Sequence, residues 1–295
     1  MEKQIYQIYD RIFKRIFSLS NLAIISLING LFGTNYPPDS EVEYPNKEYI
    51  SATLSKRLAD LIILIQGVAY HLEAQMKEDG TIVMRAFEYG FHYAMSAWDG
   101  GDVLRFPEPV IIYLDTDTEV PEISTLTLQF GEQRTFSFEV KNFVYQDHDI
   151  TELNRKKMIA LIPFQLLKLR KIIAEEPTKE NFERLKSLIL NDIIGSIKAN
   201  VQMGNITTDD ANQLKELTEQ LYEHIYQHYT ELGGYDDMKP LLDGALELPL
   251  DKYRLKIDEL EKEKLESERR IEEIKKEKDE EIRKLKIELA TLKNK

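Results

Sequence analysis

Two carboxylates and an amide in one short stretch of the chain have the residue types that divalent-metal chemistry requires. Asp60 precedes an apolar run and a turn, and Glu73 and Gln75 follow them. Carboxylate oxygens are the hard ligands that Mg²⁺ prefers, and Mg²⁺ keeps several waters when it binds. A metal ion held in this way lowers the pKa of a bound water and stabilises charge on a phosphate. These residues therefore suit a divalent-metal site, provided that the fold brings Asp60 and Glu73 together.

The stretch between the two acids predicts a β-hairpin with a tight turn. Residues 61–65 are apolar and rich in isoleucine, as in a strand that is buried on both faces. Gly67 permits the positive φ that short hairpin turns require, and Gln66 is the other loop residue. In residues 69–75 apolar and polar side chains alternate, as they do in a strand with two different faces.

A two-residue loop determines which residues of the hairpin pair. Ile65 then pairs with Val68. Counting back along both strands places Asp60 directly opposite Glu73, with Cβ atoms about 5 Å apart on one face. Two like charges at this separation destabilise a sheet unless a cation lies between them. A three-residue loop would spoil this pairing, and an ordinary hairpin whose acids face water is the alternative interpretation.

The periodicity of the surrounding sequence predicts an α/β fold, in which a mixed sheet is flanked by helices. Residues 3–33 have apolar residues at helical spacing, with a break near Ser20 and a C-cap at Gly33. Residues 107–114 form a buried strand that follows a helix and returns to the sheet through a right-handed crossover. That helix spans residues 82–98, and its expected apolar side consists of Val83, Phe87, Phe91 and Ala94. Further short strands are predicted at residues 41–44, 49–53, 126–130, 135–140 and 143–145.

The second half of the chain is predicted to be helical. Residues 153–173 form a helix that Pro163 kinks or splits, and residues 178–201 and 207–231 form two more helices. From residue 250 the composition changes to Glu, Lys, Leu and Ile without Gly or Pro. This composition predicts a coiled coil with an imperfect heptad seam, and a lone solvated helix is the alternative.

Composition and charge exclude several classes of protein. The chain has 295 residues, of which 42% are hydrophobic and 31% charged, and its apolar stretches are too short to cross a membrane. It has no cysteine, which excludes disulfides and thiolate metal sites, and the cytoplasm is the expected location. The net charge is −13, but residues 251–295 carry 15 basic and 14 acidic residues, which leaves −14 on the body. To bind nucleic acid, such a body needs a local basic groove or metal ions.

The order and spacing of the motifs resemble a known group of nucleases. Asp60, separated by twelve residues from Glu73 and its neighbour Gln75, is similar to the core motif of the PD-(D/E)XK nuclease superfamily. More closely, the chain resembles the Rpn family of recombination-promoting nucleases and transposase-like proteins. The residues that carry this closer resemblance are Asp10-Arg-Ile-Phe13-Lys14-Arg-Ile-Phe17, similar to an Asp-x-x-Phe-Lys-x-x-Phe opening, and Arg85-x-x-x-Tyr89, which follows the Glu-x-Gln strand.

The resemblance covers residues 5–175 and implies a division of the chain. Residues 1–175 are expected to form a PD-(D/E)XK nuclease-like domain, residues 176–249 a helical region, and residues 250–295 a C-terminal coiled coil. Gln75 departs from the superfamily, in which most members have lysine, although Rpn-type proteins often carry glutamine there. An amide has no charge and does not titrate near neutrality, so it can orient a water but cannot act as lysine does.

The resemblance also implies roles for the residues of the motifs. Asp60 and Glu73 are the expected ligands of Mg²⁺ or Mn²⁺, and Gln75 is expected to orient the attacking water. Asp10 and Lys14 lie four residues apart on one helical face, and the resemblance puts them at the catalytic site.

Three basic residues are the predicted nucleic-acid contacts. Arg85 contacts a phosphate or holds the acidic pair, and the alternative is a packed aromatic-rich helix whose arginine reaches solvent. Lys156 and Lys157 belong to the basic helix at residues 153–173, which is the best basic surface of the body. For that helix, a solvated face without a ligand is the alternative.

The expected function is that of a Mg²⁺- or Mn²⁺-dependent endonuclease that hydrolyses DNA, with a link to recombination or mobile elements. Two alternatives are a catalytically silent nuclease-like scaffold that assembles partners through its coiled coil, and an enzyme that cuts RNA. The expected partners are DNA and further copies of the chain, as a homodimer or higher oligomer through the C-terminal coiled coil. No membrane partner is expected.

Overall fold

The computed structural model describes residues 13–45, 60–77, 80–116 and 118–226, together with Lys264, Arg270 and Lys278. Contacts within the chain group residues 1–246 into one unit and residues 247–295 into a second. The three described residues of the second unit are helical and exposed. Most of the predicted coiled coil lies outside the described residues, as do Asp10 and the strand predicted at residues 49–53.

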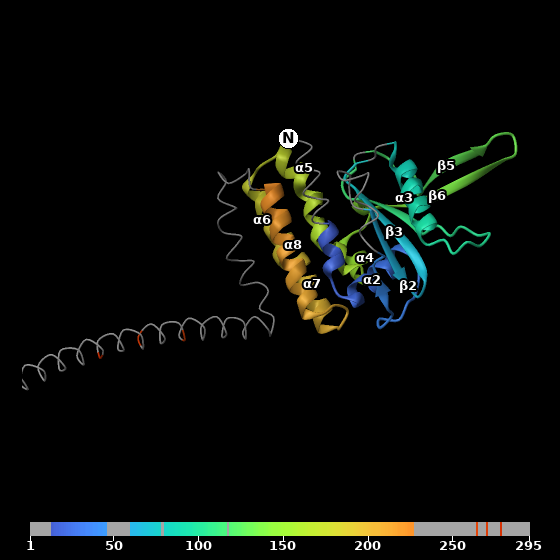
Figure 1. Ribbon diagram of the computed structural model, residues 1–295. Helices are drawn as coiled ribbons and strands as arrows, with labels where there is room; N and C mark the ends of the chain where they lie inside the picture. The colour runs from blue at the N-terminus through green and yellow to red at the C-terminus, as the bar shows by residue number, and fades with distance from the viewer. Residues whose placement is uncertain are drawn as a thin grey trace, which may run out of the picture. The chain divides into compact units, whose positions relative to one another are not determined.

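Six strands of the first unit form one mixed sheet with helices on both faces (Figure 1), which confirms the predicted α/β class. The order of the strands is β1-β2-β3-β4-β6-β5. β3, β4 and β6 run parallel, whereas β1 with β2, β2 with β3, and β5 with β6 are antiparallel pairs. The bounds of the strands are β1 Val42–Glu43, β2 Asp60–Ile65, β3 Val68–Gln75, β4 Glu108–Tyr113, β5 Ile123–Phe130 and β6 Arg134–Val144.

The carboxyl ends of the three parallel strands lie at one edge of the sheet, which we call the carboxyl edge. β3 ends there at Gln75, β4 at Tyr113 and β6 at Val144. Because β2 is antiparallel to β3, its first residue, Asp60, lies at the same edge. Ligands of open α/β sheets bind outside the carboxyl ends of the strands. The fold therefore puts the candidate metal ligands at the edge where a ligand is expected.

Two strands that the sequence predicts separately form the single strand β6. Lys141 and Asn142 interrupt the apolar pattern, but each side chain has a hydrogen-bond acceptor in the tertiary structure. Nζ of Lys141 donates to the main-chain oxygen of Leu31 at 2.9 Å, and Nδ2 of Asn142 donates to that of Pro121 at 2.8 Å. These contacts allow the strand to continue through two polar residues.

Helices lie on both faces of the sheet. Those of residues 150–226 pack against one another in a region that we call the helical side. The bounds of the helices are α2 Asn21–Phe32, α3 Ile82–Ser96, α4 Ile150–Arg155, α5 Leu167–Glu175, α6 Lys179–Ser187, α7 Ile194–Gln202 and α8 Thr208–Tyr226, with 3-10 helices η1 Ile16–Ser18, η3 Tyr145–Asp147 and η4 Ile159–Leu166 and a π-helical turn η5 Leu188–Ile193.

Both ends of α2 are as the sequence predicts. Ser20 interrupts the first helical segment and is the N-cap of α2, with its side chain accepting a hydrogen bond from the amide of Ala23. Gly33 ends the helix with a φ of 71°, a left-handed conformation that glycine adopts without a Cβ penalty.

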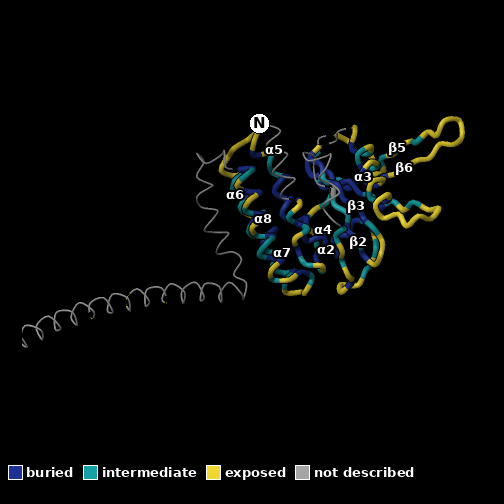
Figure 2. Tube along the Cα trace, viewed as in Figure 1, coloured by how far each residue is buried: buried dark blue, intermediate teal, exposed yellow. Residues whose placement is uncertain are grey.

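The helix predicted at residues 153–173 consists of three pieces, α4, η4 and α5. After α4, Lys157 has a φ of 56°, which a right-handed helix cannot continue through. Pro163 lies inside η4, all eight residues of which are buried. η4 contacts both α2 and α8 and lies in the buried interior of the helical side (Figure 2).

α3 and α2 cover opposite faces of the sheet. Ile82 of α3 packs with Ile111 of β4 and Val140 of β6 on one face. Lys141, the next residue of β6, reaches Leu31 of α2 on the other face. Successive residues of a strand point to opposite faces, so the two helices must lie on different sides.

Asp210 joins the start of α8 to the start of α2. Its side chain is only 1% exposed. One oxygen accepts from the amide of Ser20 at 2.6 Å, and the other accepts from the hydroxyl of Ser20 at 2.6 Å and the amide of Thr207 at 2.8 Å. A single buried carboxylate therefore satisfies donors at the N-termini of two helices that are far apart in the sequence.

We predict that Asp210→Ala lowers the free energy of unfolding by about 2 to 4 kcal/mol, because three partly buried donors lose their buried, charged acceptor. Asp209→Ala is the matched control, since Asp209 is exposed in the same first turn, and it is expected to cost less than about 1 kcal/mol. Urea unfolding measures both values. Equal losses in the two variants would contradict the role of Asp210.

Candidate functional site

The hairpin of β2 and β3 has the register that the sequence predicts. Ile65 pairs with Val68 across the turn, and Asp60 pairs with Glu73. The loop residues Gln66 and Gly67 have φ values of 51° and 79°. Two consecutive positive φ values are the property of the two-residue hairpin turn whose twist matches the strands.

Asp60 and Glu73 form a non-hydrogen-bonded pair, the type of antiparallel pair in which the two Cα atoms lie closer together. The amide of Leu114 donates to the main-chain oxygen of Gln75 at 2.8 Å, so the peptide group of Gln75 faces β4. Peptide groups two residues apart face the same way, and Glu73 therefore also turns its peptide group away from β2. In such a non-hydrogen-bonded pair the Cα atoms are about 4.5 Å apart. Asp60 thus lies on the same face as Glu73, although the position of its side chain is not described.

The carboxylate of Glu73 is buried, and only one of its oxygens has a hydrogen-bond partner. The residue is 2% exposed. Its Oε1 accepts from Nε2 of Gln75 at 2.9 Å and from Nη2 of Arg85 at 3.2 Å. Its Oε2 has no hydrogen-bond partner among the described residues. A buried carboxylate oxygen without a donor is costly, so the site favours a cation or a polar ligand at this atom.

Arg85 reaches Glu73 because α3 packs over the same face of the sheet. The side chain of Arg85 is 17% exposed, so its ion pair with Glu73 is largely shielded from water. One turn further along α3, Tyr89 lies edge-on to the ring of His71, with ring centroids 6.3 Å apart. Both motif residues of α3, Arg85 and Tyr89, therefore lie over β3. Of the two interpretations of Arg85, its contact with Glu73 favours the one in which it holds the acidic pair.

The residues present fit a hard divalent cation in part. Oε2 of Glu73 is a carboxylate oxygen that lacks a donor, and the register puts Asp60 opposite it. Carboxylates and waters are the ligands that Mg²⁺ takes in proteins. No cluster of three or more His, Asp and Glu side chains occurs among the described residues, which do not include the side chain of Asp60. Glu73, with Asp60 opposite it, would hold such an ion, and waters or substrate oxygens would be needed as further ligands.

A second buried carboxylate, Asp115, lies at the carboxyl edge one strand away. It lies two residues after the end of β4 at Tyr113 and is 2% exposed. Its oxygens contact Nη2 of Arg170, Nε2 of Gln146 at 3.3 Å and Nζ of Lys171 at 3.9 Å. Its neighbour Leu114 is the residue bonded to Gln75. Sequence analysis missed Asp115, although an acid directly after a strand buried beside β3 is a signal that could have identified it.

The remaining predicted site residues do not gather at Glu73 in the described structure. Lys14 is exposed before η1, and Asp10 lies outside the described residues. Lys157 is exposed at the positive-φ position after α4. Nζ of Lys156 is 2.7 Å from Oε1 of Glu152. Neither predicted nucleic-acid contact from the basic helix is shown to contact the acidic pair.

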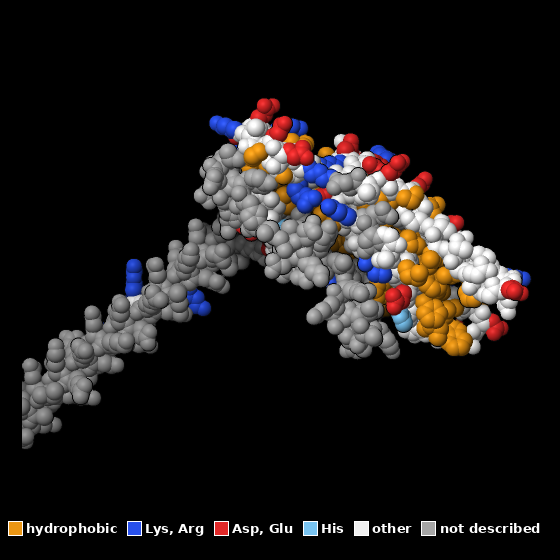
Figure 3. Space-filling view, turned by 90° about the horizontal axis from the view of Figure 1, so that it is seen from above, with side chains coloured by type: hydrophobic (Ala, Val, Ile, Leu, Met, Phe, Trp, Pro, Cys, Tyr) orange, Lys and Arg blue, Asp and Glu red, His pale blue; other side chains and the backbone are white. Residues whose placement is uncertain are grey.

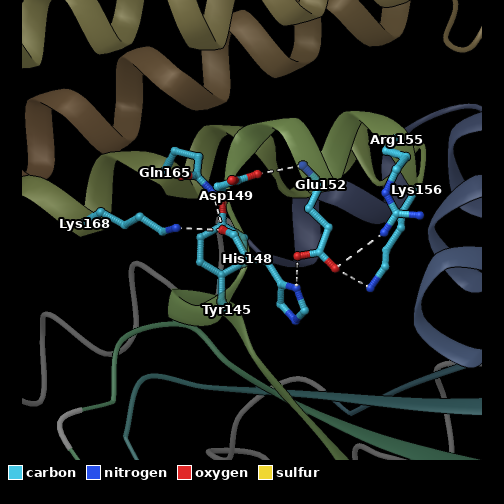
Figure 4. A network of polar contacts seen from close by, with 8 residues as sticks. All are labelled: Tyr145, His148, Asp149, Glu152, Arg155, Lys156, Gln165 and Lys168. Atoms are coloured by element: carbon cyan, nitrogen blue, oxygen red, sulfur yellow. Dashed lines mark hydrogen bonds and ion pairs between the residues drawn. The ribbon is translucent and has the colours of Figure 1, made fainter.

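Glu152 is the centre of a polar network that engages much of the predicted basic helix (Figure 4). Oε2 of Glu152 is 2.7 Å from Nδ1 of His148. Hydrogen bonds from Lys156 and His148 lower the pKa of Glu152 to about 2, so it is ionised under ordinary conditions. Nζ of Lys168 donates to the main-chain oxygen of His148 at 2.6 Å, and burial lowers the pKa of Lys168. Lys156 and Lys168 belong to the helix that the sequence predicts to contact DNA, but both are engaged by groups of the protein itself.

Comparison of the chain with protein-family models, with curated proteins and with solved structures finds no match in any of the three. Among the described residues, no helix is both long and apolar enough to cross a membrane.

We predict that Arg85→Gln lowers the free energy of unfolding by about 2 to 4 kcal/mol, because it leaves the charge of Glu73 buried without a cation. Adding Glu73→Gln should recover part of this loss, since a neutral amide is cheaper to bury than a lone carboxylate. Chemical unfolding of both single variants and the double variant in EDTA gives the coupling energy. Strictly additive losses would show that the ion pair does not stabilise the fold.

Proposed function

We propose that this chain is a metal-dependent endonuclease that hydrolyses phosphodiester bonds in DNA. The observation that carries the proposal is the direct pairing of Asp60 with Glu73, together with the buried, unpartnered Oε2 of Glu73. Two acids placed opposite each other destabilise a hairpin. A divalent cation bound between the two acids would offset their repulsion and supply the chemistry of a catalytic metal site.

We also propose that the chain is a relative of the PD-(D/E)XK nucleases, and more closely of the Rpn family. What supports this is that residues of the motif meet in space. Gln75 and Arg85 both donate to the same oxygen of Glu73, and Asp60 is its cross-strand partner. Asp60, Glu73 and Gln75 are brought together by one hairpin, whereas Arg85 comes from α3, so its contact with Glu73 depends on the packing of the helix on the sheet.

In this mechanism the chain's own residues position the reactants. Asp60 and Glu73 would hold Mg²⁺ or Mn²⁺, which when bound supplies an activated water and stabilises charge on the phosphate. Arg85 and Gln75 occupy one oxygen of Glu73, so the other oxygen is left for the metal. The amide oxygen of Gln75 can accept a hydrogen bond from the attacking water, but the amide cannot take up a proton near neutral pH.

Arg170 is the cation that we assign to the DNA backbone in place of Lys156 and Lys157. Its guanidinium is held by the buried Asp115 at the carboxyl edge, and its side chain is 30% exposed. A guanidinium matches phosphate geometry with paired donors. Lys171, 47% exposed and 3.9 Å from the same carboxylate, brings a second basic side chain to this edge. Basic side chains gathered at one edge are what a body of net negative charge needs for binding DNA.

We predict that the purified protein cleaves supercoiled plasmid with Mg²⁺ or Mn²⁺, and that cleavage stops in EDTA. Glu73→Gln should lower cleavage at least about 100-fold while keeping a similar shape, because the amide is a far poorer ligand for a hard cation. Titration of Mn²⁺ by calorimetry, on the same two proteins, tests whether the loss follows loss of the metal. Lys157→Gln is the control variant, and its cleavage should be unchanged.

The other outcomes of this experiment each select an alternative. Cleavage of RNA but not DNA, lost in Glu73→Gln, would move the substrate to RNA. Absence of Mn²⁺ binding together with absence of cleavage would support a silent scaffold. Undiminished cleavage by Glu73→Gln would reject the site.

We predict that Arg170→Gln raises the KM for DNA about tenfold and changes kcat less than threefold, because a backbone contact contributes to binding more than to the chemical step. The effect should shrink as salt is raised, since it depends on phosphate neutralisation. Thermal unfolding checks that the fold survives the loss of the partner of Asp115. A fall in kcat with an unchanged KM would place Arg170 in the chemical step instead.

A further inference from the structure

α3 has a second apolar side that faces away from the sheet. The sequence predicts Phe91 on the buried side of this helix, but it is 40% exposed, whereas Tyr89 is buried. With it, Met84, Met95 and Trp98 are 56%, 45% and 49% exposed. Met84, Phe91 and Met95, spaced seven and four residues apart, lie on one stripe of α3, and Trp98 follows the end of the helix. A helix with two apolar sides is characteristic of an element that is covered on both.

The hairpin of β5 and β6 continues this apolar surface. On the face that it shares with α3, Leu126 pairs with Phe138 and Leu128 pairs with Phe136, while the opposite face carries Thr, Ser and Gln residues. α3 covers only the base of the hairpin, and beyond it the strands project from the body (Figure 1). Near the end of the projection Phe130 and Phe136 are 55% and 51% exposed, with their rings 5.8 Å apart.

Ring contacts join the helix stripe to the hairpin. Phe87 of α3 lies 6.5 Å from Phe91, 5.5 Å from Phe106 and 5.3 Å from Phe138, measured between ring centroids. We call the outer stripe of α3, these rings and the projecting hairpin the apolar face. Hydrophobic side chains gather at this end of the molecule in Figure 3.

The apolar face is large enough for a stable interface. Six large side chains are about half exposed, and since such side chains bury roughly 150–250 Å² each, they leave on the order of 600 Å² of apolar surface. The largest apolar patch of a typical monomer is about 300–600 Å². With a polar rim, this face approaches the roughly 800 Å² that each partner buries in a standard protein–protein interface.

We propose that a second copy of this chain covers the apolar face, in a two-fold dimer in which the projecting hairpin of each copy packs on α3 of the other. The apolar face provides both surfaces of such a contact: the projecting hairpin, which acts as an arm, and the outer side of α3. In a two-fold dimer each of these surfaces is used twice. The arrangement also covers β5, which is an edge strand of the sheet.

Charge on the apolar face supports a second copy over other partners. Arg134 lies opposite Phe130 on the apolar side of the hairpin, and Glu88 is exposed on α3 between Met84 and Phe91. Neither makes an ion pair with another described residue. In the dimer, Arg134 of each arm meets Glu88 of the other copy. A membrane surface or DNA would instead require a basic rim, whereas Glu88 puts an exposed acid among the apolar side chains of α3.

The first test is a charge exchange in the full chain, measured by sedimentation over a concentration series. Arg134→Glu alone and Glu88→Arg alone should each raise the dimer dissociation constant about tenfold, because like charges then meet across the interface. The double variant should return to within about threefold of the original. Phe136→Glu should raise the constant at least about tenfold, whereas Thr135→Glu, on the polar side of the same strand, should change it less than threefold.

The second test locates the contact, and it separates this interface from any association through the C-terminal tail. Because the chain has no cysteine, introduced thiols are the only ones that react. Gln133→Cys protein mixed with His92→Cys protein should form a cross-linked heterodimer with a short bismaleimide. Both positions are exposed beside Arg134 and Glu88 and leave the aromatic residues in place. The control pair is Ser137→Cys with His92→Cys, in which the first thiol lies on the polar face.

Four results would overturn the proposal. One is a chain that stays monomeric at about 50 μM, a concentration at which a standard interface is populated. Another is a dimer that neither charge reversal nor Phe136→Glu weakens. The third is cross-linking of the Gln133 pair that is no faster than that of the Ser137 control. Binding of vesicles or DNA by the apolar face, lost in Phe136→Glu while the dimer persists, would likewise reassign the surface. None of these readouts depends on nuclease activity, so this proposal and the proposed function can fail separately.

Discussion

The buried carboxylate of Glu73 is the constraint on which the hairpin, α3 and the proposed site all depend. Removing such a charge from water costs several kcal/mol unless partners surround it. Gln75 and Arg85 satisfy one oxygen, which requires β3 to present its polar face to α3 at this point. The second oxygen has no donor among the described residues, and the neighbouring strand presents Asp60 opposite it. The protein thus places two acids together where a compact fold would ordinarily avoid them, which is why we interpret the position as a site.

The parallel strands bring a second buried acid to the carboxyl edge. Because β4 lies next to β3, the residues that follow β4 come within one strand of the Glu73 hairpin. One of them, Asp115, is as buried as Glu73 but has a different role in the structure: it holds Arg170 of α5. An acid with one oxygen that lacks a donor and an arginine held by a second acid are therefore arranged along one edge. A metal ion and a phosphate need this combination of charges.

Charge and apolar surface are separated on this molecule. The predicted basic helix uses Lys156 and Lys168 in a network around Glu152 and His148, so that basic charge stays within the helical side. At the other end of the body, α3 and the projecting hairpin carry aromatic residues on the outside. The network around Glu152 reduces the basic charge available for a ligand. The exposed aromatic residues supply apolar surface that another protein can cover. The proposed nuclease site and the proposed dimer contact therefore use different sides of α3: Arg85 faces the sheet, whereas Met84 and Phe91 are exposed on the outer side.

The sequence by itself determined the elements that depend on neighbouring residues. The turn at Gln66 and Gly67, the register that pairs Asp60 with Glu73, and the caps of α2 follow from local pattern, because hairpin pairing and helix ends are decided within a few residues. Only the tertiary structure decided which partners the charges find: Arg85 for Glu73, Arg170 for Asp115, and Glu152 for Lys156. It also decided that Phe91 faces outward and that residues 159–166 break from the helix into the core. These outcomes depend on contacts between residues far apart in the chain, where burial outweighs local propensity.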